Sequence, residues 1–160
     1  MNNLSHLLKR LTDAGIEFVV VGGYAAVLHG SAYITNDLDV CVVLSPENIE
    51  RLRRSLADIH PIHRMTHQKV SFLEYPPAGE SLRNLYLETD DGVLDVLGSV
   101  LGIGEYEQLA RQSIEISLFG RKCRVISLEG LIIAKEAMGR EKDLLTVKEL
   151  RAIAARRKQP

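Results

Sequence analysis

Two carboxylates one residue apart, Asp37 and Asp39, are the side chains whose spacing points most directly to chemistry. Residues 37–44 alternate between polar and apolar types, which predicts a β-strand with both carboxylates on one face. Like charges held this close repel one another unless a cation lies between them. Since Mg²⁺ takes hard oxygen ligands together with substrate phosphates, the pair favours a magnesium site. A strand whose second face is simply solvated is the alternative interpretation.

A pair of glycines, Gly22 and Gly23, separates an apolar run at residues 16–21 from a short predicted helix at residues 24–29. Glycine lets the backbone approach a ligand closely, and a helix N-terminus offers free N–H groups. Phosphate is the ligand that this arrangement favours. An ordinary turn between a strand and a helix accounts for the glycines equally well.

Asp95 is a third candidate, because it interrupts the apolar run at residues 93–97. A charged side chain among apolar neighbours is costly unless it is paired or bound to a metal. Together with Asp37 and Asp39, it would complete a site for two metal ions. The nearby Asp90 and Asp91 are explained by a predicted turn, and Glu88 by an exposed strand face.

The elements that must position these residues follow from periodicity and from turn and cap residues. The predicted helices cover residues 3–14, 24–29, 46–59, 105–111, 128–138 and 141–156. The predicted strands cover residues 16–21, 37–44, 69–75, 85–89, 93–97, 114–119 and 122–126, with hairpin turns at Asp91-Gly92 and Gly120-Arg121. We therefore expect one α+β domain over residues 1–160, with helices packed on a mixed or antiparallel sheet and a helical pair at the C-terminal end.

Composition narrows the class of protein. The chain has 160 residues, of which 46% are hydrophobic, and a net charge of −1. This excludes a disordered chain and a disulfide-stapled miniprotein. The apolar runs are too short to cross a membrane, residues 1–10 do not resemble a secretory signal, and Cys41 and Cys123 lie in apolar runs, so we expect a cytoplasmic protein.

The ordered set of these residues resembles the DNA polymerase β-type nucleotidyltransferase superfamily. The closer likeness is to small bacterial and archaeal nucleotidyltransferases, including the toxins of abortive-infection (type IV) toxin–antitoxin pairs. The residues that carry the resemblance are Gly22, Gly23, Ala25, His29, Gly30, Thr35, Asp37, Asp39, Asp95, Lys135, Gly139, Arg140, Lys142 and Asp143. The sequence departs from many relatives at Tyr33, where they carry an arginine.

The resemblance implies the nucleotidyltransferase fold and Mg²⁺-dependent transfer of a nucleoside monophosphate from a nucleoside triphosphate to a hydroxyl group. It implies that Asp37, Asp39 and Asp95 hold two Mg²⁺ ions and that Gly22 and Gly23 cradle phosphates. Two basic residues would contact the triphosphate or the acceptor, namely Lys135 and Arg140. The acceptor would be RNA (tRNA included), a protein or a small molecule, and an antitoxin would be a further partner.

Two other functions stay open. One is a non-catalytic module that binds nucleotides, which the residue at position 33 favours and the three carboxylates oppose. The other is a nucleic-acid-binding module that uses the net basic segment from residue 135 to residue 158. A zinc site at His60, His63 and His67 is weaker, because no cysteine or carboxylate accompanies the histidines.

Overall fold

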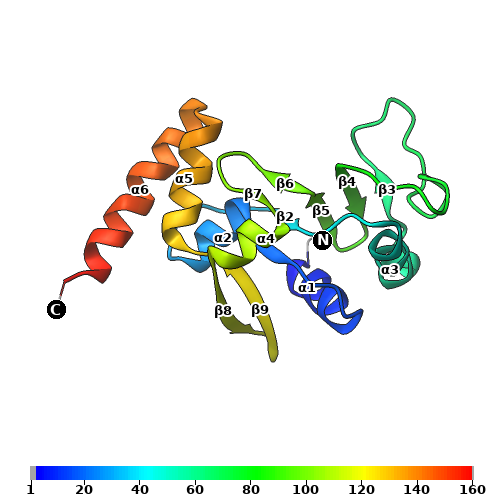
Figure 1. The fold of residues 1–160 in the computed structure, drawn as a ribbon, viewed down its shortest axis with the longest axis horizontal. Coiled ribbons are helices and arrows are strands. Elements are labelled where there is room, and N and C mark those ends of the chain that lie inside the picture. Colours follow the sequence, from blue (N-terminus) through cyan, green and yellow to red (C-terminus); the bar gives the residue numbers. More distant parts are fainter. Residues whose placement is uncertain (1–2, 160) are drawn as a thin grey trace.

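A mixed sheet forms the centre of the molecule in the computed structural model, which describes residues 3–159 (Figure 1). Within these residues the sheet has seven strands in the order β3-β4-β5-β2-β1-β9-β8. Its strands are β1 (Val19–Val21), β2 (Asp37–Cys41), β3 (Ile62–His63), β4 (Asn84–Thr89), β5 (Gly92–Leu97), β8 (Ser113–Leu118) and β9 (Arg121–Ile126). A separate two-stranded hairpin consists of β6 (Ser99–Val100) and β7 (Gly104–Glu105).

Six α-helices accompany the sheet in the described part of the chain. They are α1 (Leu4–Asp13), α2 (Gly22–Leu28), α3 (Pro46–Leu56), α4 (Tyr106–Arg111), α5 (Leu128–Met138) and α6 (Glu141–Arg157). A single 3₁₀ turn, Ala57–Ile59, extends α3. Helices α5 and α6 pack against each other at one end of the molecule (Figure 1). The α+β class, the mixed sheet and the C-terminal helical pair are thereby confirmed.

The strand pairing brings distant segments together. Strands β2 and β5 are parallel neighbours, as are β1 and β9, whereas β1 and β2 run antiparallel. The parallel pairing of β2 with β5 is the contact that matters for the candidate site, because it sets residues 37–41 beside residues 93–97 in register.

Local sequence signals place several element boundaries correctly. The Ser45 hydroxyl accepts a hydrogen bond from the Asn48 amide at the start of α3, and Ser127 caps α5 through the Gly130 amide. Gly139 ends α5 in the left-handed conformation, with φ of 68°. Both predicted hairpins form, although each turn lies one residue earlier, at Asp90-Asp91 and at Phe119-Gly120.

Other predictions were wrong. Residues 69–75 form turns rather than a strand, with an isolated bridge from Ser71 to Ile62. The reason is that the carbonyl of Phe72 accepts a hydrogen bond from the Arg53 guanidinium, and the Ser71 carbonyl is used in local turns. The predicted loop at residues 60–67 contains β3, and the two strands β6 and β7 were not predicted.

The core lies between the sheet and the helices. Leu7, Leu8 and Leu11 of α1 are buried, and α1 contacts α3, β2, β5 and β9. No helix of residues 3–159 is long and apolar enough to span a membrane. One domain over residues 1–160 stays a prediction, and residues 1, 2 and 160 lie outside the described part of the chain.

Candidate active site

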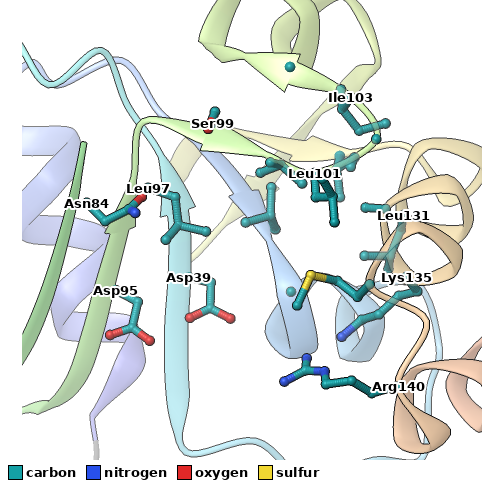
Figure 2. Close-up of a pocket in the computed structure, with 18 of the residues that line it drawn as sticks. Asp39, Asn84, Asp95, Leu97, Ser99, Leu101, Ile103, Leu131, Lys135 and Arg140 are labelled. Carbon is teal, nitrogen blue, oxygen red and sulfur yellow. The ribbon is translucent and has the colours of Figure 1, made fainter. Parts of the chain in front are cut away.

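Strand register brings the three predicted carboxylates onto neighbouring positions. Asp39 of β2 is paired with Asp95 of β5, and Asp37 lies two residues earlier on β2. Figure 2 shows the carboxylates of Asp39 and Asp95 side by side, facing the same cavity. The alternate residues Leu38 and Val40 are fully buried. Period-two geometry therefore separates an apolar face, which belongs to the core, from an acidic face, which borders a cavity.

Asp39 is the most perturbed carboxyl group in this cluster. Its pKa is raised to about 7, first by burial and then by the charges of Asp95 and Asp37. The positive charges of Lys135 and Arg64 act in the opposite direction but are the smaller causes. The nearby positive charges therefore do not balance the negative charge of the ionised Asp39 side chain, and a bound cation would balance it.

Asp95 has a partner that the sequence did not reveal. Arg64 donates from Nη2 to Asp95 Oδ2 at 2.6 Å and from Nε to Oδ1 at 3.2 Å. Burial nevertheless raises the pKa of Asp95. As the side chains stand, no group of three His, Cys, Asp or Glu side chains within residues 3–159 is arranged to hold a metal ion. The arginine therefore occupies the carboxylate that was expected to complete the metal site.

Gly22 and Gly23 form the first turn of α2, rather than a separate turn before it. Gly22 has φ of 67°, and a Cβ atom there would collide with Oδ2 of Asp39. At Gly23 a Cβ atom would lie 3.3 Å from the Thr35 hydroxyl. Gly22 is thus required by both its backbone conformation and the space that Asp39 occupies, whereas a Cβ atom at Gly23 would need only a small shift of the Thr35 side chain.

Lys135 near the end of α5 and Arg140 just before α6 form the opposite wall of the cavity (Figure 2). Both are held by Asp143, whose side chain is only 1% exposed: Arg140 Nε lies 2.7 Å from Oδ2, and Lys135 Nζ lies 3.6 Å from Oδ1. The hydrogen bond from Arg140 holds the pKa of Asp143 below its usual range. One buried carboxylate therefore fixes two cations across from the acidic strands.

Two cavities meet at this place. The larger has a volume of about 840 Å³ and lies between the acidic strands, α5 and the β6–β7 hairpin. Its lining changes from charged to apolar toward the side chains of Leu101, Ile103, Leu131 and Met138. The smaller cavity, about 200 Å³, is lined by Gly23, Asp37 and Lys142 among others. Asp39, Lys135 and Arg140 border both cavities.

The comparisons with known proteins concern the fold. No protein-family model matches the chain, and no curated protein matches its sequence. Among solved structures, the lincosamide antibiotic adenylyltransferase LnuA with bound lincomycin aligns with a TM-score of 0.62 and 18% identity, over 94% of this chain and 95% of that one. The chain has the nucleotidyltransferase fold.

Two further nucleotidyltransferase structures align over nearly the whole chain. A proposed nucleotidyltransferase from Thermotoga maritima, TM1012, gives a TM-score of 0.54 with 16% identity, over 93% of this chain and 94% of that one. ANT(2'')-Ia in complex with adenylyl-2''-tobramycin gives 0.50 with 14% identity, over 93% and 95%. At such identities the likeness concerns the fold, and the roles of individual residues must be argued from the site.

Within this nucleotidyltransferase fold three of the histidines have structural partners. His29 is buried, and its Nε2 lies 2.7 Å from the carbonyl oxygen of Ile126. His63 Nε2 lies 2.8 Å from the carbonyl oxygen of Tyr75, and His60 Nδ1 lies 2.6 Å from an Asp90 oxygen. In the described residues the three histidines of the proposed zinc site are therefore not gathered around one point.

The donor set around Asp39 fits Mg²⁺ chemically. The oxygens of Asp37, Asp39 and Asp95 are hard ligands on rigid strands, and the raised pKa of Asp39 shows that its negative charge lacks compensation. Asp95 can join such a set only when Arg64 releases it. Arg64 itself was missed because it lies in a segment predicted as a loop, where no periodicity marks its direction.

Proposed function

We propose that this protein is a nucleotidyltransferase that moves a nucleoside monophosphate from a nucleoside triphosphate to the hydroxyl group of a small molecule. One observation carries the proposal: Asp39 and Asp95 border the larger cavity, Asp37 and Asp39 border the smaller one, and Lys135 and Arg140 line both. The fixed cations suit the binding of an anionic triphosphate. The carboxylates suit a metal cation that would assist the attack of a hydroxyl group.

The triphosphate would bind at the smaller cavity. Three cations line it, Lys135, Arg140 and Lys142, beside the carboxylates of Asp37, Asp39 and Asp143. The first turn of α2 contributes backbone at Gly23. Asp143 holds two of the cations in place before the nucleotide arrives, so little ordering is needed on binding. The nucleoside and the acceptor would then share the larger cavity.

In the reaction, the acceptor oxygen would attack the α-phosphorus while the bond to the β-phosphate oxygen breaks and pyrophosphate leaves. Asp95 would accept the hydroxyl proton at a carboxylate oxygen and pass it to solvent. Asp37 and Asp39 would hold Mg²⁺, with Asp95 as a further ligand. Bound Mg²⁺ would neutralise developing charge on the phosphates and make the hydroxyl group easier to deprotonate.

A small molecule is favoured as the acceptor over RNA or protein. The larger cavity is lined in part by the apolar side chains of Leu101, Ile103 and Met138, which suit an acceptor with an apolar part. Two of the similar structures hold antibiotics or an adenylylated antibiotic, lincomycin and adenylyl-2''-tobramycin. A role in a toxin–antitoxin pair, an RNA acceptor and a cytoplasmic location remain predictions.

The test uses each nucleoside triphosphate labelled either at the α-phosphate or at the γ-phosphate, with Mg²⁺ and a panel of amphipathic alcohols and amino sugars. The proposal expects the α-label in an acceptor product and the γ-label in pyrophosphate. Transfer of the γ-label would instead identify a kinase. Triphosphate binding with no product across small molecules, total RNA and protein would favour the non-catalytic module.

A further inference from the structure

Arg64 lies directly after β3, and its side chain reaches Asp95 in the candidate site. Its backbone amide donates to the carbonyl of Tyr86 at 3.0 Å, so its main chain is anchored to β4 directly after β3. From there the guanidinium crosses toward β5, lying 5.5 Å from the centre of the Tyr86 ring. Its Nη2 and Nε atoms donate to the two oxygens of Asp95. Each carboxylate oxygen of Asp95 therefore accepts a hydrogen bond from the arginine.

The ion pair between Arg64 and Asp95 occupies oxygens that a metal ion at the candidate site would need. Asp95 is 9% exposed and stands beside Asp39, so its oxygens are the ones that a cation held by Asp39 would reach. A carboxylate engaged by a bidentate arginine cannot at the same time ligate a metal through the same lone pairs. The arginine side chain is 26% exposed, and its remaining terminal nitrogen contacts the Met65 sulfur at 3.2 Å. It therefore has room to leave toward solvent.

We propose that Arg64 is a positioning residue that covers Asp95 in the empty enzyme and is displaced when a divalent cation binds between Asp39 and Asp95. The inference rests on the proposed function, since it assumes that these carboxylates hold a cation. Before binding, the arginine holds both oxygens of the third carboxylate by hydrogen bonds. Divalent cation binding is then a competition with the guanidinium for the same oxygens.

The competition predicts a specific effect of substitution. Arg64→Gln removes the competing charge, and Arg64→Lys keeps a charge but loses the two-pronged geometry. We expect Arg64→Gln to bind Mn²⁺ about three- to tenfold more tightly than the natural protein, as the loss of a partly exposed ion pair would allow. Arg64→Lys should fall between the two, because an ammonium group cannot engage both oxygens in the same way.

The matched control is Arg121→Gln. Arg121 makes a similar two-pronged pair with Asp13, at 2.8 and 3.4 Å, and it does not border either cavity of the site. Mn²⁺ affinity would be measured by electron paramagnetic resonance and calorimetry, in the absence of nucleotide. Thermal melts would establish that each variant is folded, and Arg64→Lys serves as the test if Arg64→Gln is not.

The outcomes separate the inference from the function on which it rests. Tighter Mn²⁺ binding in Arg64→Gln, intermediate binding in Arg64→Lys and no change in Arg121→Gln support the inference. Equal Mn²⁺ affinity in the natural protein and both Arg64 variants, with binding lost in Asp39→Asn, would overturn it and leave the proposed function intact. If Mn²⁺ binds to none of these proteins, even with a nucleoside triphosphate, the metal site of the proposed function is itself wrong.

Discussion

At the scale of single residues, Asp39 is the side chain on which the proposed catalysis depends most. It is the carboxyl group that both cavities share, and burial together with two like charges raises its pKa to about 7. A side chain kept in so unfavourable a setting destabilises the empty protein. Such a cost is typical of functional sites, where a ligand supplies the missing charge.

Asp39→Asn should therefore stabilise the protein without ligands. Because the pKa of Asp39 in the folded chain lies above the ordinary value of 3.8, the natural protein loses stability as the pH rises from about 4 to about 7. The asparagine variant has no such loss, so its advantage in the free energy of unfolding should grow over that window and stay constant above it. Urea melts at several pH values measure it. An advantage that shrinks with rising pH would contradict the assignment.

Gly22 and Gly23 differ in what they tolerate. Gly22→Ala places a methyl group against Asp39 at a positive φ, so we expect a loss of at least 1–2 kcal/mol of stability, about the cost of left-handed backbone alone. Gly23→Ala is the control, since it meets the Thr35 hydroxyl at 3.3 Å and its φ is not in the left-handed region. Chemical denaturation should show a clearly smaller change for Gly23→Ala. Equal losses would mean that Asp39 does not press against Gly22.

At the scale of elements, the junction between α5 and α6 holds two positively charged side chains beside the larger cavity. Gly139 ends α5 and turns the chain so that Lys135 before it and Arg140 after it converge on Asp143. The acidic strands and this junction are far apart in sequence but face each other across the larger cavity (Figure 2). The proposed function thus places triphosphate binding mainly at this junction and the chemistry at the acidic strands.

Removing both cations should separate binding from chemistry. Lys135→Ala with Arg140→Ala should raise KM for the triphosphate about 10- to 100-fold and leave Mn²⁺ binding without nucleotide nearly unchanged, as expected when binding contacts are lost. Arg151→Ala is the control, because Arg151 lies on α6 but pairs with Glu136 rather than with the site. Steady-state kinetics and Mn²⁺ titration provide the two measurements. An unchanged KM would remove these residues from the triphosphate site.

Sequence reasoning succeeded where the signal is local and failed where it depends on packing. Alternation from Asp37 onward, the caps at Ser45 and Ser127 and the stop at Gly139 are properties of a few neighbouring residues, so they could be predicted. Residues 69–75 look like a strand, yet the Arg53 side chain binds the Phe72 carbonyl and local turns use the Ser71 carbonyl. The approach of Arg64 to Asp95 depends on strand order, which no local pattern encodes.

At the scale of the whole molecule, the balance of 20 basic and 21 acidic residues conceals a division of charge. The acidic cluster lies on the sheet, whereas the segment from residue 135 to residue 158 is net basic, and Lys135 and Arg140 of that segment line the larger cavity opposite Asp39 and Asp95 (Figure 2). A nucleic-acid-binding module would need its basic face free. Here two of the cations at the junction are committed to Asp143 and turned toward the cavity.

Ligand-induced stabilisation tests this arrangement in the intact chain. A nucleoside triphosphate with Mg²⁺ at about a hundred times its Kd should add about 2.7 kcal/mol, a rise of several degrees in Tm. Single-stranded RNA of equal phosphate concentration should add much less. Thermal melts with both ligands, each at low and moderate salt, compare them. A larger and strongly salt-dependent effect of RNA would instead favour the nucleic-acid-binding module.

The central claim is that carboxylates on β2 and β5 catalyse nucleotidyl transfer, and Asp39→Asn tests it most directly. The measurement is Mg²⁺-dependent transfer of the α-label to the acceptor found for the natural protein, with Asp58→Asn, a loss of one exposed carboxylate paired with Arg10, as the control. We expect Asp39→Asn to be folded and to lose transfer by about three orders of magnitude or more, since about 1.4 kcal/mol of lost transition-state stabilisation is tenfold in rate. Asp58→Asn should retain full transfer. Undiminished transfer in a folded Asp39→Asn protein would contradict the account.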